Sequence, residues 1–224
     1  MKIDFVTLFP GMFEPVLGAS IIGRARESGR LELGWVNPRD FSRDKHKKVD
    51  DRPFGGGAGM LLSAEPLYSA IKSVRKPESR VVYLSPQGRR FDQKAAARLS
   101  KERHLVLVCG HYEGVDERVM KCFDEELSIG DFVLTGGELP AMVVADAVAR
   151  LLPGVLKKAD AAVRESFEGG LLDYPQYTRP RLWRGRKVPE ALLSGDHKRI
   201  ADWRLRAARL ATRRKRPDLF VVNS

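Results

Sequence analysis

The first 150 residues alternate short apolar runs with segments of helical periodicity, and this alternation restricts the fold more than any other feature of the sequence. Apolar runs at Lys2–Leu8, Arg80–Leu84 and His104–Cys109 predict strands. The last run is almost continuously apolar, as strands covered on both faces of a sheet are. Segments such as Ala64–Val74 and Leu139–Leu151 carry apolar residues at helical spacing. Strands that alternate with helices indicate an α/β domain with a mainly parallel sheet.

The pattern changes after the Pro153-Gly154 pair, which ends the last of these helices. Residues 157–170 carry charged and small side chains and predict an interdomain linker. Residues 171–224 are chiefly helical, with one long helix expected over Asp196–Arg214. Its apolar positions are Ile200, Trp203, Ala207 and Leu210. We therefore expect a larger α/β domain over residues 1–156 and a small helical domain over residues 171–224.

The excess positive charge lies in one part of the chain. Of 40 Lys and Arg and 29 Asp and Glu residues, Arg179–Arg216 holds 14 basic and three acidic ones, whereas the first 178 residues are close to neutral. A polyanion-binding module attached to a neutral body has this distribution. Trp183 and Trp203 lie among these charges, and aromatic rings beside arginine stack on unpaired bases. The pattern favours a nucleic acid partner over a solvated helix face with two core tryptophans.

Several classes of protein are excluded. No apolar run approaches the roughly 20 residues that span a bilayer, and the first 15 residues lack the pattern of a secretory signal. Without a long apolar run or face, we also expect no membrane partner. Cys109 and Cys122 could form at most one disulfide, so we expect a reduced, cytoplasmic protein. The chain has no phosphate-binding P-loop, no dinucleotide motif and no nucleophile elbow. Its four histidines lack metal-ligand spacing, so no metal-ligating residues are assigned.

Three loops follow predicted strands and contain glycine: Leu84–Gly88, Gly110–Gly114 and Ser128–Pro140. Loops at the carboxyl ends of parallel strands gather on one edge of a sheet and form its ligand crevice. Glycine lets the backbone approach a ligand closely and leaves N–H and C=O groups available to it. The loops are therefore expected to hold an adenosine-like cofactor through main-chain hydrogen bonds. The alternative is that they are only tight turns between helices and strands.

The chain also contains a series of longer motifs, spread from Phe9-Pro10 to about Leu219. They are Asp50–Gly57, Tyr83–Gly88, Cys109–Arg118, Ser128–Leu134, Gly136–Pro140, Tyr177–Pro180 and Leu193–His197. In composition and order these motifs resemble the bacterial TrmD family, the tRNA (guanine-N1)-methyltransferases that act at position 37 beside the anticodon. The resemblance implies a SPOUT-type fold whose three loops form a deep trefoil knot, a topology that is otherwise very rare.

The same resemblance implies the ligands and the assembly. S-adenosylmethionine is the implied methyl donor, the tRNA anticodon stem-loop is the implied substrate, and the implied assembly is a homodimer with its active site at the subunit interface. Dependence on Mg²⁺ is also implied, although no cluster of ligands in the sequence indicates a site for it. By match to the family motifs, thirteen residues of the three loops are implied to bind the cofactor. They are Leu84, Ser85, Pro86, Gly110, Tyr112, Glu113, Ile129, Gly130, Phe132, Leu134, Gly136, Gly137 and Pro140.

Two further residues are implied to be catalytic. Guanine N1 carries a proton at neutral pH, so methylation there requires a general base, and a guanidinium stabilises the negative charge that develops on O6. The resemblance implies Glu165 for the first role and Arg150 for the second. The family has Asp at the position of Glu165, so the carboxylate of this chain is one methylene further from the backbone. Glu165 with a compensating backbone shift is the favoured base. Asp160 or Asp173 in its place, or weakened catalysis, are the alternatives.

The remaining expectations concern RNA binding. The loop Asp50–Gly59 is expected to close over the target base and the cofactor, with its glycines as hinges. Arg179, Arg181 and Arg184 are expected to contact tRNA phosphates, together with the helix after Asp196. A rival interpretation is a catalytically silent RNA-binding protein that keeps the SPOUT fold, which only the change at position 165 favours. A methyltransferase for another RNA fits less well with the basic C-terminal segment.

Overall fold

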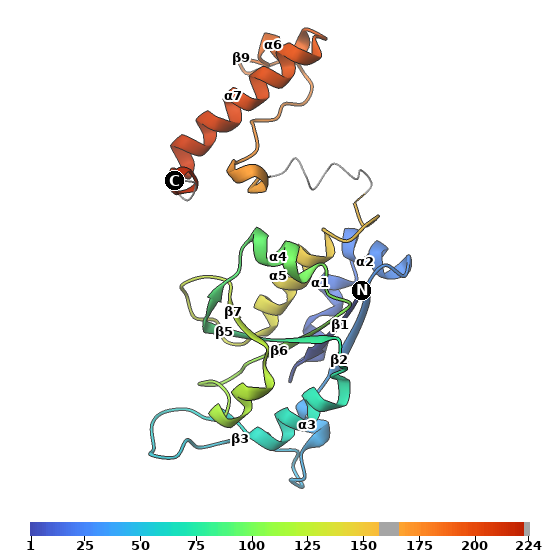
Figure 1. Ribbon diagram of the computed structural model, residues 1–224, viewed down its shortest axis with the longest axis vertical. Coiled ribbons are helices and arrows are strands. Elements are labelled where there is room, and N and C mark those ends of the chain that lie inside the picture. Colours follow the sequence, from blue (N-terminus) through green and yellow to red (C-terminus); the bar gives the residue numbers. More distant parts are fainter. Residues whose placement is uncertain (157–165, 222–224) are drawn as a thin grey trace. The chain divides into compact units, whose positions relative to one another are not determined.

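A computed structural model of the protein describes residues 1–156 and 166–221. The chain divides into two compact units, Met1–Lys158 and Ala159–Ser224 (Figure 1). The first unit contains the parallel sheet, and the second contains the long helix of the basic segment.

Five strands form one parallel sheet within residues 1–156, in the order β2-β1-β6-β5-β7. Their bounds are β1 (Lys2–Val6), β2 (Glu32–Val36), β5 (Ser79–Arg90), β6 (His104–Cys109) and β7 (Glu125–Ser128). Every residue of the central strand β6 is buried, as its continuous apolar sequence predicts. The expected α/β fold with a mainly parallel sheet is therefore confirmed.

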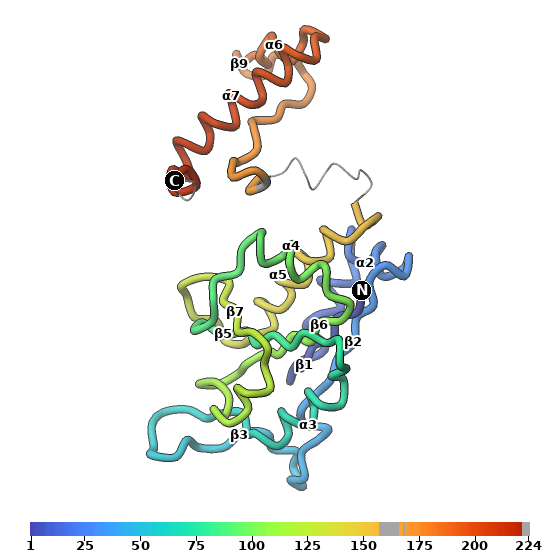
Figure 2. The backbone as a smooth tube through the Cα atoms, in the orientation of Figure 1, coloured from blue at the N-terminus to red at the C-terminus, as the bar shows by residue number. Residues whose placement is uncertain are grey.

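Helices cover both faces of this sheet (Figures 1 and 2). Apolar side chains such as Phe5 and Leu107 face one cluster, and their neighbours Val6 and Val106 face another, because successive residues of a strand point to opposite sides. The first cluster includes residues of α1 (Glu14–Leu17), α2 (Ser20–Glu27), α4 (Gln93–Leu99) and α5 (Glu138–Ala149). The second includes residues of α3 (Ala64–Val74) and the 3-10 helix η3 (Glu117–Cys122).

Two local features differ from the sequence pattern. The segment Asp116–Phe123 has the composition of an α-helix, but the structure forms the tighter 3-10 helix η3 there. Strand β5 does not end at Leu84: it resumes beyond a bulge, and Arg89 and Arg90 again pair with β7. The loop Ser85–Gly88 is thus an excursion within one strand, which fixes both of its ends against β7.

Shorter elements complete the first unit. They are η1 (Pro10–Met12), η2 (Pro38–Phe41), β3 (Asp50–Asp51) and β4 (Leu61–Leu62). The last two pair in antiparallel fashion and close the base of the glycine-rich segment between them.

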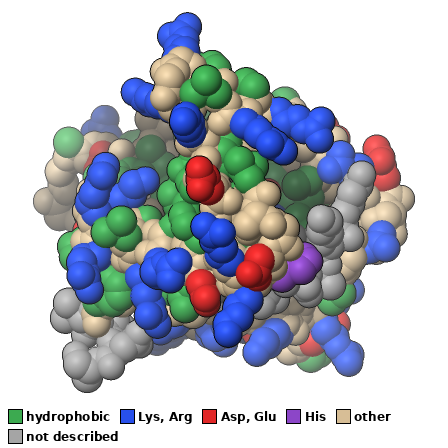
Figure 3. All heavy atoms as spheres, turned by 90° about the horizontal axis from the view of Figure 1, so that it is seen from above, with side chains coloured by type: hydrophobic (Ala, Val, Ile, Leu, Met, Phe, Trp, Pro, Cys, Tyr) green, Lys and Arg blue, Asp and Glu red, His purple; other side chains and the backbone are tan. Residues whose placement is uncertain are grey.

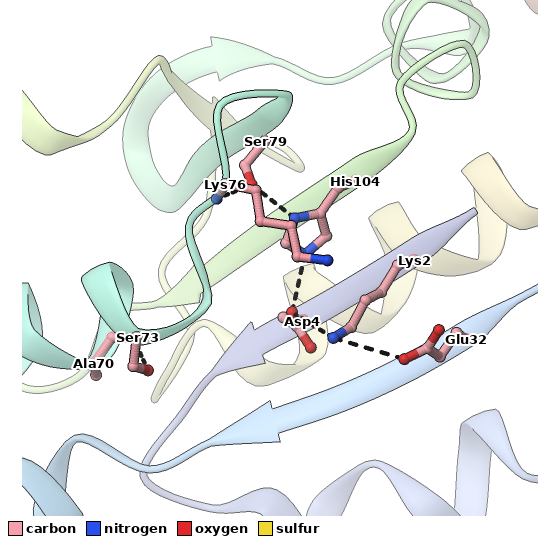
Figure 4. A network of polar contacts seen from close by, with 8 residues as sticks. All are labelled: Lys2, Asp4, Glu32, Ala70, Ser73, Lys76, Ser79 and His104. Carbon is pink, nitrogen blue, oxygen red and sulfur yellow. Dashed lines mark hydrogen bonds and ion pairs between the residues drawn. The ribbon is translucent and has the colours of Figure 1, made fainter.

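A polar network lies where the strands of the sheet begin (Figure 4). Asp4 and His104 are each 3% exposed, and the His104 Nε2 atom lies 2.9 Å from Asp4 Oδ2. The other ring nitrogen of His104 lies 2.7 Å from the Ser79 hydroxyl. Partial burial lowers the pKa of Lys2, but the carboxylates of Asp4 and Glu32 together outweigh that effect and raise it. The Lys2 amino group lies 3.3 Å from the Asp4 carboxylate. Partners on each side thus compensate the buried charge of Asp4.

The C-terminal unit is built on α7 (His197–Lys215), which confirms the helix expected over Asp196–Arg214. Ala208 and Thr212 are buried one turn apart, and the Thr212 hydroxyl accepts the backbone N–H of Leu172 at 2.9 Å. Leu210 was expected on the apolar face but is 68% exposed. It lies two residues from both buried positions and therefore points away from them.

The other elements of this unit are short: η5 (Glu168–Gly170), β8 (Leu182–Trp183), β9 (Arg186–Lys187), α6 (Glu190–Leu193) and α8 (Asp218–Val221). On the face shown in Figure 3, lysine and arginine side chains predominate over acidic ones.

Candidate functional site

The loops that follow or interrupt β5, β6 and β7 line a cavity of about 400 Å³ at the carboxyl edge of the sheet. All thirteen residues that the sequence assigned to the cofactor line this one cavity. The volume lies within the usual range of small-molecule sites. Residues from three segments that are far apart in the sequence therefore share a single ligand-sized space.

Backbone contacts hold two of the loops together. The N–H of Gly137 donates to the carbonyl of Gly110 at 2.8 Å, and His111 forms an isolated β-bridge with Gly136. A Cβ atom at Gly137 would lie 2.6 Å from the Cα atom of Cys109, closer than packed atoms approach. Only glycine therefore allows the two loops to approach each other this closely.

A buried carboxylate lies behind the same loops. Glu138, in the first turn of α5, is 1% exposed, and its Oε1 accepts the Thr7 hydroxyl at 2.7 Å. Its Oε2 lies 2.8 Å from Nε2 of His111, a cavity-lining residue whose ring packs against Phe9. Neither Glu138 nor His111 was assigned a role from the sequence. A glutamate directly after the glycine pair and a histidine inside a ligand loop were the available signals.

Tyr83, which lies just before the bulge in β5, and Cys109, the last residue of β6, are both buried. Burial, with a smaller contribution from the Glu126 carboxylate, raises the pKa of Tyr83 to about 12. Burial, with the Glu138 carboxylate, raises the pKa of the Cys109 thiol well above its usual range. Both groups are therefore uncharged at neutral pH, and the thiol lacks the thiolate character of a nucleophile. Cys109 and Cys122 are free thiols, as expected.

The glycine-rich segment between β3 and β4 is attached to the cavity at its carboxyl end. The carbonyl of Met60 accepts the N–H of Glu113 at 3.0 Å, and the N–H of Leu62 donates to Gly114 at 2.9 Å. Phe54, near the tip of the segment, is fully exposed. The segment thus has a fixed end at the Glu113 loop and an apolar tip in solvent.

Of the two residues implied to be catalytic, the structure describes Arg150 but not Glu165. Arg150 follows α5, and its N–H donates to the carbonyl of Asp146 at 3.1 Å. Glu165 lies outside the described residues, and so does Asp160. Asp173 lies in the C-terminal unit, where its carboxylate accepts the Gln176 side-chain amide at 2.7 Å. The assignment of the base therefore stays a prediction.

Across residues 1–156 and 166–221, no group of three or more His, Cys, Asp or Glu side chains is arranged to hold a metal ion. Over the same part of the chain, no helix combines the length and the apolar character needed to cross a bilayer.

The fold and the cavity define a parallel α/β enzyme domain with a ligand crevice at the carboxyl edge of its strands. Comparison with known proteins identifies the family: the chain belongs to the tRNA (guanine-1)-methyltransferase TrmD family, whose model matches residues 1–222. The chain is therefore a methyltransferase, and the resemblance seen in its motifs is confirmed.

Individual relatives align with this chain over nearly their whole length. A tRNA (guanine-N(1)-)-methyltransferase of Dictyoglomus turgidum is 53% identical over 224 residues, covering 100% of this chain and 91% of the relative. The protein of the same name from Ruminiclostridium cellulolyticum is 55% identical, covering 98% of this chain and 96% of its own. The protein of the same name from Moorella thermoacetica is 55% identical, covering 99% of this chain and 90% of the relative.

Proposed function

We propose that this protein transfers a methyl group from S-adenosylmethionine to N1 of the guanosine at position 37 of tRNA. The observation that carries the proposal is the single cavity lined by all thirteen residues implied to bind the cofactor. Family membership supports the reaction class and the tRNA substrate.

The chemistry of the cavity fits this donor. Ile129, Leu134 and Pro140 offer apolar surface for an adenine ring, and loop N–H and C=O groups offer partners for its edge. The carboxylates of Glu113 and Glu117 also line the cavity, and they suit a ligand that carries a cationic sulfonium and an ammonium group. When bound, S-adenosylmethionine supplies a methyl group on a positively charged sulfur that is open to in-line attack.

The chain's own residues supply the rest of the chemistry. Glu165 removes the proton from guanine N1 as the N1 atom attacks, and the carboxylate holds that proton afterwards. Arg150 places a guanidinium against O6, where negative charge develops as N1 loses its proton. The loop Asp50–Gly59 closes over the target base and excludes water. Its attachment to Glu113 through the Met60 carbonyl supports a role beside the cavity.

The proposed organisation follows the same reasoning. Residues 1–156 form the cofactor-binding domain, residues 157–170 the linker and residues 171–224 the basic tRNA-binding domain. Residues 157–165 of that linker lie outside the described residues. The deep trefoil knot stays a prediction, and so does a cytoplasmic location. Dependence on Mg²⁺ also stays a prediction.

Homodimer formation is part of the proposal. Leu139 and Val143, four residues apart on α5, are 49% and 47% exposed. Met12 and Val16, in the segment before α2, are also exposed. Exposed apolar residues on neighbouring elements are typical of a surface that a partner covers.

The test is methyl transfer from labelled S-adenosylmethionine to a tRNA with guanosines at positions 36 and 37. Wild type is compared with Glu165→Ala, Glu165→Asp and, as a matched carboxylate control, Asp173→Asn. The expected product is N1-methylguanosine at position 37. Activity falls by about 10²-fold or more in Glu165→Ala, because general bases typically contribute 10²–10⁴-fold, whereas Glu165→Asp and Asp173→Asn stay active.

Two results contradict the proposal in different ways. Full activity of Glu165→Ala together with loss in Asp173→Asn moves the base to Asp173. Cofactor binding and RNA binding without product in any variant supports the catalytically silent RNA-binding protein instead.

A further inference from the structure

The hairpin formed by β8 and β9 carries an exposed tryptophan among arginine and lysine residues. Trp183 pairs with Arg186 across the two strands. The turn residues Arg184 and Gly185 have φ angles of 48° and 75°. Positive φ at both central positions matches the two-residue turns that follow the twist of a hairpin. The hairpin therefore presents its side chains from a regular scaffold.

The tryptophan and the cations form one feature. Trp183 is 55% exposed, and the guanidinium carbon of Arg184 lies 5.1 Å from the centre of the Trp183 ring. Arg186 projects from the same face, because cross-strand partners share a face of the sheet. Within the described residues, none of Arg181, Arg184, Arg186 and Lys187 forms an ion pair with a carboxylate. The hairpin thus has positive charge without an internal counter-charge.

This combination fits an unpaired nucleotide. The face of an aromatic ring stacks on any base, and arginine and lysine beside it neutralise the neighbouring phosphates. A lipid surface fits less well. Leu182, the other exposed apolar residue of β8, points to the opposite face from Trp183, so the hairpin has no continuous apolar side to insert.

We propose that the β8–β9 hairpin is a nucleotide-docking site, in which Trp183 stacks on an unpaired base of the RNA substrate. Arg184 and Arg186 flank that base, and Arg181 and Lys187 contact the adjoining phosphates. The proposal rests on the proposed function only in taking RNA as the substrate. It adds a base contact to a basic domain that otherwise offers phosphate contacts.

The test uses the full-length protein and an unmodified tRNA transcript, with affinity measured by fluorescence anisotropy at several salt concentrations. Trp183→Ala is expected to weaken binding by about 5- to 160-fold, since stacking on one base contributes about 1–3 kcal/mol. The slope of log K against log salt is expected to stay unchanged. Lys187→Ala, the matched control, is expected to reduce that slope by about one phosphate contact.

Two more readouts separate stacking from a structural role. Trp183→Phe keeps an aromatic face and is expected to retain most of the affinity. RNA is expected to quench the tryptophan fluorescence of wild type, and Trp183→Phe is expected to lose that part of the quenching. Melting temperatures of all variants are expected to match wild type, because Trp183 is exposed.

Three outcomes overturn the proposal. Unchanged RNA affinity in Trp183→Ala removes the stacking contact, and normal methyl transfer by the same variant shows that the proposed function stands without it. Equal loss in Trp183→Ala and Trp183→Phe with lowered melting temperatures assigns the ring a structural role. If Trp183→Ala loses binding to anionic phosphatidylglycerol vesicles that wild type binds, and its RNA affinity stays intact, the hairpin is assigned to a lipid surface.

Discussion

Replacement of Thr7 by valine tests the buried network behind the cavity. Thr7 is fully buried, and its hydroxyl donates to the Glu138 carboxylate at 2.7 Å while it accepts the N–H of Phe9 at 2.9 Å. Valine has nearly the same shape but neither donates nor accepts. Glu138 is 1% exposed, so water does not readily replace the lost donor.

The expected cost follows from these contacts. A hydrogen bond to a charged group contributes about 1.5–3 kcal/mol, and a buried acceptor left without it is destabilising by a similar amount. We therefore expect Thr7→Val to lower the free energy of unfolding by about 2–3 kcal/mol. For a protein of this size that corresponds to a fall in melting temperature of roughly 4–12 °C.

The assay is urea unfolding and calorimetry of wild type, Thr7→Val and Thr7→Ser. Serine keeps the hydroxyl and loses one methyl group, at a cost of about 1 kcal/mol. The hydrogen bond thus predicts that the more apolar valine variant is the less stable one, the reverse of the order that burial of apolar surface predicts. A Thr7→Val protein as stable as Thr7→Ser refutes the reasoning.

Three other predictions concern separate parts of the first unit. Gly137→Ala is expected to abolish cofactor binding measured by calorimetry, because its Cβ would collide with backbone in β6, and unchanged affinity contradicts this. Hydrogen bonds from Arg118 lower the pKa of Asp116 to about 2 in the folded state, against 3.8 ordinarily. A pKa that is lowered in the folded state contributes stability that is present above pH 4 and is lost as the pH falls toward 2. Between pH 4 and pH 2, wild type should therefore lose more of its free energy of unfolding than Asp116→Asn does. The same pH dependence in both proteins contradicts this prediction. His104→Leu removes a buried hydrogen-bond partner of Asp4 and is expected to lower the free energy of unfolding by about 1–3 kcal/mol in urea unfolding, whereas a loss under 1 kcal/mol means that Lys2 alone compensates the carboxylate.

The accuracy of the sequence interpretation varies with how local each signal is. The strand His104–Cys109 and the helix Ala64–Val74 have the bounds that their apolar patterns predict. Asp92 caps the start of α4, with its carboxylate accepting the N–H of Ala95 at 2.8 Å. The prediction for the long C-terminal helix was less accurate, because Leu210, expected on its apolar face, lies away from the buried residues of α7.

The sequence by itself determined the alternation of strands and helices, the confinement of positive charge to the C-terminal segment and the motifs of the methyltransferase family. These are properties of neighbouring residues and of order along the chain, so they need no knowledge of long-range contacts. The tertiary structure alone decided which residues lie behind the three loops. It connects Thr7, Glu138 and His111 in one network. Such contacts depend on how parallel strands are ordered in the sheet, because that order determines which loops share an edge, and no local pattern contains it.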